Sequence, residues 1–335
     1  MLRVLPLKHL CLSALAVALL SAPLLAKPPA PARTAAGNPP ALAVAAKAPP
    51  VPLLWKVSDA DNSLYLLGSF HLLKRDDYPL SKDIDNAFAA ADKLVFEVPP
   101  AEMHDPATAQ KALAHAGYGD ARTLSKVLPV VMRDKFNALL VKRGGSIAQF
   151  DPFEPWFVNL TLVMGLSQSM GFRGEDGLDQ HLMRRAAAAN KPTSGLETVD
   201  SQLQALDNTP MKEQIASLRE FVDAPDKMPG MLDELHRAWR QGDVAKLEAL
   251  TRGEMLANTP ETYRLLNVVR NEAWLPKLRK LLDESSSDDT LVVVGAMHLL
   301  GTDGVVERLR GKGYRVERVC WACNVKKPGR AAGRR

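Results

Sequence analysis

Two histidines occupy the same place in a short pattern that the chain contains twice. His71 follows Gly68 in LYLLGSFHLLK, and His298 follows Gly295 in LVVVGAMHLLG, so G-x-x-H-L-L closes two distant apolar stretches. Imidazole is a common metal ligand and a general base near neutral pH. The repeat therefore predicts one shared site. For either histidine alone, the alternative is that it caps a helix or satisfies a buried carbonyl.

An acidic residue ends a third apolar stretch. Glu97 closes KLVFEV, where a carboxylate is costly unless it is paired or binds a cation. If this stretch lies beside the one that ends at Gly68, His71, Glu97 and His298 form a ligand set for a divalent metal (Zn, Mn or Co) and leave a position for water. The alternatives are that Glu97 faces solvent on an edge strand or pairs with an arginine.

Two further charged residues follow apolar segments. Glu197 in SGLETVD is predicted to be a further ligand or the general base that deprotonates a metal-bound water, with capping of the next helix as the alternative. Arg270 in NVVRNEAW is predicted either to stabilise an oxyanion or to pair with Glu97 or Glu197, and pairing is favoured. Adjacent helical residues point about 100° apart, so only one of Arg270 and Asn271 is expected to face the site directly.

The other histidines carry weaker signals. Asp179 and His181 are two residues apart in GLDQHL and do not share a helix face, which argues against both serving as ligands to one metal, and one of them is expected to lie behind the ligands. Three more histidines of the predicted folded part are interpreted as surface or structural residues: His104, His115 and His236. The chain has no G-x-S-x-G, no H-E-x-x-H and no glycine-rich phosphate loop, which argues against those classes of enzyme.

Short apolar segments and helical segments alternate along the chain, which is typical of an α/β domain. Residues 103–168 and 199–285 are helical in character, so the predicted strands gather toward the two ends of the domain. We therefore predict a central sheet formed by N- and C-terminal strands, with a large inserted helical layer. The two G-x-x-H turns then meet at the carboxyl edge of the sheet, where open α/β sheets bind ligands. The predicted strands cover residues 52–57, 64–69, 93–98, 192–196, 290–295 and 314–318.

The ends of the chain differ from its centre. Residues 1–26 combine basic residues with an apolar stretch and small residues, which predicts a cleaved signal peptide, with an uncleaved membrane anchor as the alternative. Residues 27–50 are rich in Ala and Pro and are interpreted as a linker. The folded part is predicted to cover 51–325 and a basic tail 326–335. We therefore expect a periplasmic or secreted protein without a stable membrane span after signal removal.

Charge and cysteine content bear on the partners of the protein and on its disulfides. The chain has a net charge of +5, but its two ends carry ten of the 43 basic residues and none of the 38 acidic ones. The folded part is therefore acidic, which argues against nucleic acid as a partner. Cys320 and Cys323 lie close to the basic tail, and an exported chain meets an oxidising compartment. This predicts a local disulfide with a structural or incidental role, and a redox-active pair is the alternative.

Several segments, taken in order, resemble the TraB/GumN family, which is related to the Tiki proteins and more distantly to the erythromycin-esterase-like proteins. The segments are LGSFHLL, VFEV, DPFEPWFVNL, GLDQHLMRRA, GLETVDSQL, VVRNEAW and VVVGAMHLLG, and the resemblance covers about residues 52–318. In the Tiki branch it implies metal-dependent proteolysis with the G-x-x-H histidines and the glutamate at the active site. Here these are His71, His298 and Glu97. Bacterial GumN-like members are associated with exopolysaccharide gene clusters.

Residues and resemblance together predict an exported metal-dependent hydrolase that acts on a peptide or another exported substrate. One alternative is hydrolysis without a metal, in which a histidine is the general base and Glu97 orients it. A second alternative is a periplasmic accessory or binding protein for polysaccharide biosynthesis or export, without catalysis. The sequence predicts neither the substrate nor the oligomeric state.

Overall fold

A computed structural model describes residues 47–284 and 287–324. The predicted signal peptide, most of the predicted linker and the basic tail lie outside these residues. No helix of the described ranges is long and apolar enough to cross a membrane.

A six-stranded mixed sheet forms the centre of the fold and confirms the predicted α/β class. The strand order is β4-β3-β5-β2-β1-β6, so strands from the two ends of the domain pair with each other. β5 pairs in parallel with β2 on one side and with β3 on the other. The strands are β1 (Leu54–Ser58), β2 (Ser63–Ser69), β3 (Lys93–Phe96), β4 (Thr193–Gly195), β5 (Thr290–Gly295) and β6 (Arg315–Arg318). Each predicted strand is present with its bounds shifted by at most a few residues.

Burial explains where each strand lies. All six residues of β5, TLVVVG, are buried, as expected for a central strand covered on both faces. β6, RVER, alternates between exposed and half-buried residues at the sheet edge. Charged side chains on an edge strand oppose pairing with another chain.

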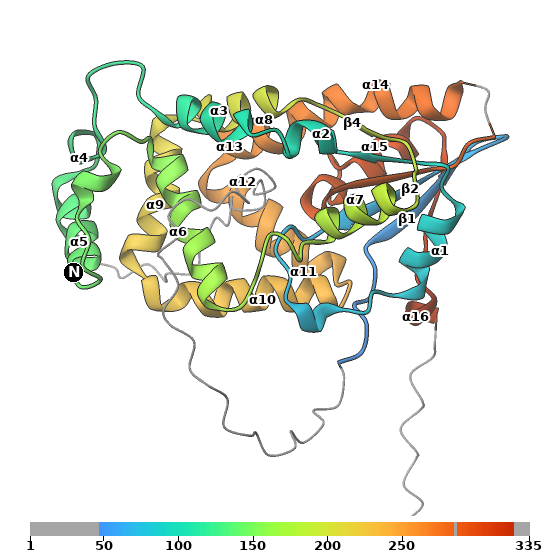
Figure 1. Ribbon diagram of the computed structural model, residues 1–335, viewed down its shortest axis with the longest axis horizontal. Helices are drawn as coiled ribbons and strands as arrows, with labels where there is room; N and C mark the ends of the chain where they lie inside the picture. The colour runs from blue at the N-terminus through green and yellow to red at the C-terminus, as the bar shows by residue number, and fades with distance from the viewer. Residues whose placement is uncertain (1–46, 285–286, 325–335) are drawn as a thin grey trace, which may run out of the picture.

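Helices make up most of the rest of the described chain and include the predicted inserted layer (Figure 1). In this view the strands lie toward the right, and α4, α5, α6 and α9 lie at the left. The helices are α1 (Lys82–Ala90), α2 (Pro100–Met103), α3 (Ala107–Ala116), α4 (Leu124–Val127), α5 (Val130–Val141), α6 (Pro155–Ser169), α7 (Leu178–Ala188), α8 (Val199–Asp207), α9 (Met211–Asp223), α10 (Met228–Arg240), α11 (Val244–Glu248), α12 (Glu254–Asn258), α13 (Pro260–Tyr263), α14 (Val269–Asp283), α15 (Val305–Gly311) and α16 (Trp321–Asn324). Short 3₁₀ segments are η3 (Arg75–Asp77), η4 (Ile147–Phe150), η5 (Pro225–Lys227) and η8 (Ala296–Leu299), and π-helical turns are η6 (Ala249–Gly253) and η7 (Arg264–Val268).

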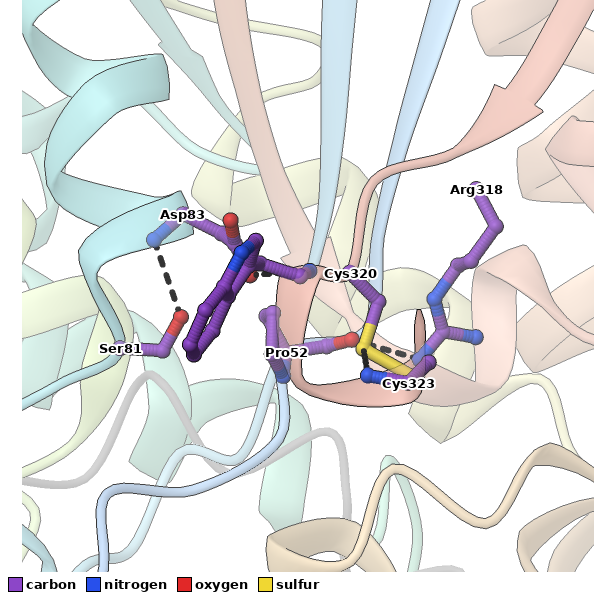
Figure 2. Close-up of a disulfide and its surroundings, with 7 residues drawn as sticks. Pro52, Ser81, Asp83, Arg318, Cys320 and Cys323 are labelled. Atoms are coloured by element: carbon purple, nitrogen blue, oxygen red, sulfur yellow. Dashed lines mark hydrogen bonds between the residues drawn. A yellow bond between two sulfur atoms is a disulfide. The ribbon is translucent and has the colours of Figure 1, made fainter. Parts of the chain in front are cut away.

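The predicted local disulfide is present at the end of β6. Cys320 and Cys323 are bonded, and the Trp321 backbone N–H donates to Asp83 at the start of α1 (Figure 2). Arg318 donates to the Pro52 carbonyl before β1. The last described residues are thereby joined to the first strand and the first helix of the domain.

Candidate active site at the carboxyl edge of the sheet

The two G-x-x-H turns leave the sheet side by side. β2 and β5 are parallel neighbours in which Ser69 lies opposite Gly295, so both turns emerge at the same edge. His298 lies in η8, directly after β5, and both His71 and His298 are buried. The prediction that the repeated turns are neighbours in space is confirmed.

Glu97 reaches the same point from the other side of β5. The ligand set was predicted on the condition that the strand of Glu97 lies beside the one that ends at Gly68, but β3 pairs with β5, which lies between the two. Glu97 Oε1 is 3.9 Å from Nε2 of His71 and 3.9 Å from Nε2 of His298. It also accepts a hydrogen bond of 2.6 Å from the Gly295 backbone N–H. The three residues predicted as metal ligands thus converge on one point.

Glu197 joins them through the neighbouring strand. β4 pairs with β3, and the Glu197 backbone N–H donates to the Glu97 carbonyl oxygen at 2.8 Å. Glu197 does not cap the next helix, because Thr198 is the N-cap of α8 and accepts from the Ser201 backbone N–H. Its carboxylate instead lies 2.5 Å from Arg270 Nη2.

Arg270, at the start of α14, pairs with both carboxylates. Its Nη2 donates to Glu97 at 2.6 Å and to Glu197 at 2.5 Å, and its Nε donates to Glu197. Its Nη1 donates to the Leu266 carbonyl and faces His298 Nε2 at 3.1 Å. A guanidinium has five N–H donors, and all five are used here. The arrangement therefore supports the pairing role that the sequence analysis favoured, and no N–H remains for an oxyanion.

Each histidine is oriented from its Nδ1 side by a different residue. His71 Nδ1 is 3.1 Å from Asp179 Oδ1, which also accepts from the Ser69 hydroxyl. His298 Nδ1 is 2.8 Å from Asn271 Oδ1. Asp179 is thus the one residue of its pair near the site. Of residues 270 and 271, Arg270 contacts both carboxylates, whereas Asn271 contacts His298 from the Nδ1 side of its ring.

The electrostatic environment separates the two histidines. Burial opposes a charge on His71, but Asp179 outweighs it and raises the histidine's pKa above its ordinary value. For His298, burial and then the Arg270 charge lower the pKa to about 3, so this ring is neutral at physiological pH. Burial alone would raise the pKa of Glu97, yet the Arg270 guanidinium holds it at about 2. Burial raises the pKa of Glu197 despite its pairing with Arg270.

The sequence analysis missed two residues of the cluster. Gln202 on α8 donates to Glu97 Oε2 at 2.9 Å and to Glu197 Oε1 at 3.2 Å. Trp274 on α14 donates its indole N–H to Glu197, and its ring centroid is 4.4 Å from that of His298. Trp274 lies one helical turn after Arg270, so the helix face of Arg270 was the one pattern that pointed to it.

The other histidines within the described residues bond or pack outside the cluster. His181 packs against the Tyr78 ring, and buried His236 bonds to Asp77, which is the structural role expected for it. His115 pairs with Asp207 at 3.2 Å in a geometry similar to that of His71 and Asp179, but with more solvent exposure.

A family model described as TraB/PrgY/gumN matches residues 53–318, the segment that contains every residue of the cluster. The chain belongs to the TraB/PrgY/gumN family. It is 24% identical over 259 residues to a protein of Escherichia coli (strain K12) named "Uncharacterized protein YbaP". The aligned region covers 73% of this chain and 87% of that relative. A Shigella flexneri protein of the same name shows the same identity and coverage. No solved structure matches the chain.

The metal that the resemblance to Tiki proteins implies does not fit the residues of this cluster as they are arranged. In residues 47–284 and 287–324, no group of three or more His, Cys, Asp or Glu side chains is placed to hold a metal ion. His71, Glu97 and His298 supply suitable donor atoms, but Arg270 lies within hydrogen-bonding distance of two of them. The metal-ligand role of these three residues stays a prediction.

Proposed function

We propose that this chain is a hydrolase in which His71 transfers the proton. The observation that carries the proposal is the pair of Asp179 and His71. Asp179 holds the ring at Nδ1, while Nε2 faces Glu97 Oε1 at 3.9 Å, too far for a direct hydrogen bond. A carboxylate behind an imidazole fixes its tautomer and stabilises its protonated form.

The charges of the cluster suit attack by water. A water molecule between His71 Nε2 and Glu97 Oε1 gives a proton to His71 as its oxygen bonds to the carbonyl carbon of the substrate. The bond between that carbon and the leaving group then breaks, and His71 returns the proton to the leaving group. Glu97, with its pKa of about 2, stays ionised and accepts a hydrogen bond from that water. Arg270 acts through its charge, because its N–H groups are bonded within the chain.

The metal-dependent version predicted from the sequence uses the same residues differently. It is supported by the convergence of two imidazole Nε2 atoms and one carboxylate oxygen, with Glu197 as the group that moves the proton. The close contact of Arg270 with His298 and Glu97 favours the version without a metal.

The sequence supports a proposal for the substrate class and for the location. We propose a peptide or another exported substrate and a periplasmic or secreted location, on the basis of residues 1–26 and the family resemblance. The accessory or binding protein is the second candidate. It is favoured by the burial of the whole cluster and by the complete pairing of Arg270, which are also features of a purely structural ion network.

The experiment uses residues 27–335 and a panel of peptide and ester substrates, with and without a chelator. We expect activity that survives the chelator and falls about 10²- to 10⁴-fold in His71→Ala, the range for loss of a general base. His115→Ala is the matched control, since it also removes a histidine paired with an aspartate. Full activity in His71→Ala contradicts the proposal. Activity that the chelator abolishes and Zn, Mn or Co restores selects the metal-dependent version.

A further inference from the structure

We infer that the Arg270 guanidinium occupies the place of a divalent cation, so that the two histidines and Glu97 hold no resident metal ion in this chain. This inference goes beyond the proposed function because it concerns what the cluster binds. Its test is ion binding, and it stands whether or not the cluster hydrolyses a substrate.

The hydrogen bonds around His298 fix which ring nitrogen carries the lone pair. The Asn271 amide nitrogen donates to the carbonyl oxygens of His298 and Asp303, so its Oδ1 faces the ring. His298 Nδ1 therefore carries the proton and donates to Asn271 Oδ1 at 2.8 Å. The lone pair is left on Nε2, which accepts from Arg270 Nη1 at 3.1 Å. The nitrogen that a metal needs is already bonded to a cation.

The carboxylates are committed in the same way. Glu97 Oε2 accepts from Arg270 at 2.6 Å and from Gln202 at 2.9 Å, and Glu97 Oε1 accepts from the Gly295 N–H at 2.6 Å. Glu197 accepts from Arg270, Gln202 and Trp274. A second cation would lie beside a buried guanidinium and would take over the acceptor atoms that neutralise it. Repulsion between two buried cations opposes this.

Arg270 is also held in place on its other sides. Its Nη1 donates to the Leu266 carbonyl at 2.9 Å, and its guanidinium carbon lies 4.9 Å from the centre of the Trp274 ring. The side chain is 6% exposed. Its withdrawal would break every one of these contacts, so the guanidinium is a fixed part of the cluster.

The test measures Co²⁺ and Zn²⁺ binding to residues 27–335 by visible absorption and by metal analysis after dialysis. We expect no stoichiometric ion in the wild type and about one ion per chain in Arg270→Met, which uncovers His298 Nε2 and the Glu97 oxygens. Adding His298→Ala to Arg270→Met should abolish the gained site. The control Arg252→Met removes an arginine that pairs with Glu248 and Asp303 outside the cluster, and should bind no ion.

Two results overturn the inference. One is a wild type that binds about one ion with a cobalt spectrum that His298→Ala removes. The other is a folded Arg270→Met that binds no ion, because the guanidinium then does not occupy an ion's place. If Arg270→Met does not fold, Arg270→Gln replaces it in the test, since it removes the charge and keeps an N–H donor for Glu97.

Discussion

Removing the Arg270 charge should destabilise the protein more than any other single change in the cluster. Arg270→Met leaves Glu97 and Glu197 as buried carboxylates without their cation, and these side chains are only 6% and 8% exposed. Breaking a buried ion pair by removing one partner costs about 3–5 kcal/mol. Whole domains are stable by about 5–15 kcal/mol, so this loss is a large share of the total.

The loss is measured as the free energy of unfolding in urea at pH 7, with a chelator present so that no ion replaces the arginine. The triple variant Arg270→Met/Glu97→Gln/Glu197→Gln should recover most of it, because neutral groups replace the whole ionic network. Arg252→Met serves as the control. Its ion pairs are more exposed, so we expect a loss of about 1 kcal/mol or less.

The reasoning fails if Arg270→Met stays within about 1 kcal/mol of the wild type, the range of exposed ion pairs. It also fails if the triple variant is no more stable than the single one, because the loss then comes from packing against Trp274 and not from the uncompensated carboxylates.

Three further outcomes follow from the cluster. Gly295→Ala places a methyl group 3.0 Å from His71 Nε2 and 3.2 Å from Glu97 Oε1 with φ −51° and ψ 136°, which alanine adopts. We expect kcat/KM to fall about 10²-fold, and overpacking to lower the free energy of unfolding by about 1–3 kcal/mol. An unchanged kcat/KM would show that the reaction takes place elsewhere in the molecule. Asp179→Asn should lower kcat about 10²-fold or more with little change in KM. An equal loss of kcat in the control His115→Ala would show that the loss does not depend on the cluster. The pKa values of His298, about 3, and Glu97, about 2, lie below the values that these groups have in an unfolded chain. The unfolded chain therefore binds protons first as the pH falls, and the folded protein loses stability relative to it. Urea unfolding should show stability falling from pH 6.5 downward by up to about 1.4 kcal/mol per unit and more steeply below 4.5, and His298→Asn should remove the loss between 6.5 and 4.5.

The sequence predicted the edge of the sheet better than the inside of the site. Apolar stretches that end in glycine fixed β2 and β5 closely, and parallel pairing then brought His71 and His298 together. The pattern did not specify strand order, because any of these short apolar strands could pair with any other. In the structure β5 lies between β3 and β2, so Glu97 reaches the cluster from the far side of β5.

Helix geometry accounts for the different contacts of residues 270 and 271. Adjacent side chains on a helix point about 100° apart, so the two approach the cluster from different directions. Arg270 approaches the Nε2 side of His298 and Asn271 the Nδ1 side, so the two residues contact opposite sides of one ring. Gln202 could not be predicted, because its role depends on the tertiary placement of α8, which brings its amide within hydrogen-bonding distance of both Glu97 and Glu197.

The repeated turn gives its two histidines different chemistry because their surroundings differ. Asp179, a carboxylate, lies behind His71 and favours the protonated ring. Asn271, a neutral amide, lies behind His298, and Arg270 in front of it disfavours a second positive charge. One histidine is therefore suited to carry a proton and the other to remain a neutral acceptor. A symmetric pair of metal ligands needs two neutral rings with free Nε2 atoms. In this cluster Asp179 favours the protonated form of His71, and the Nε2 atom of His298 is already bonded to Arg270.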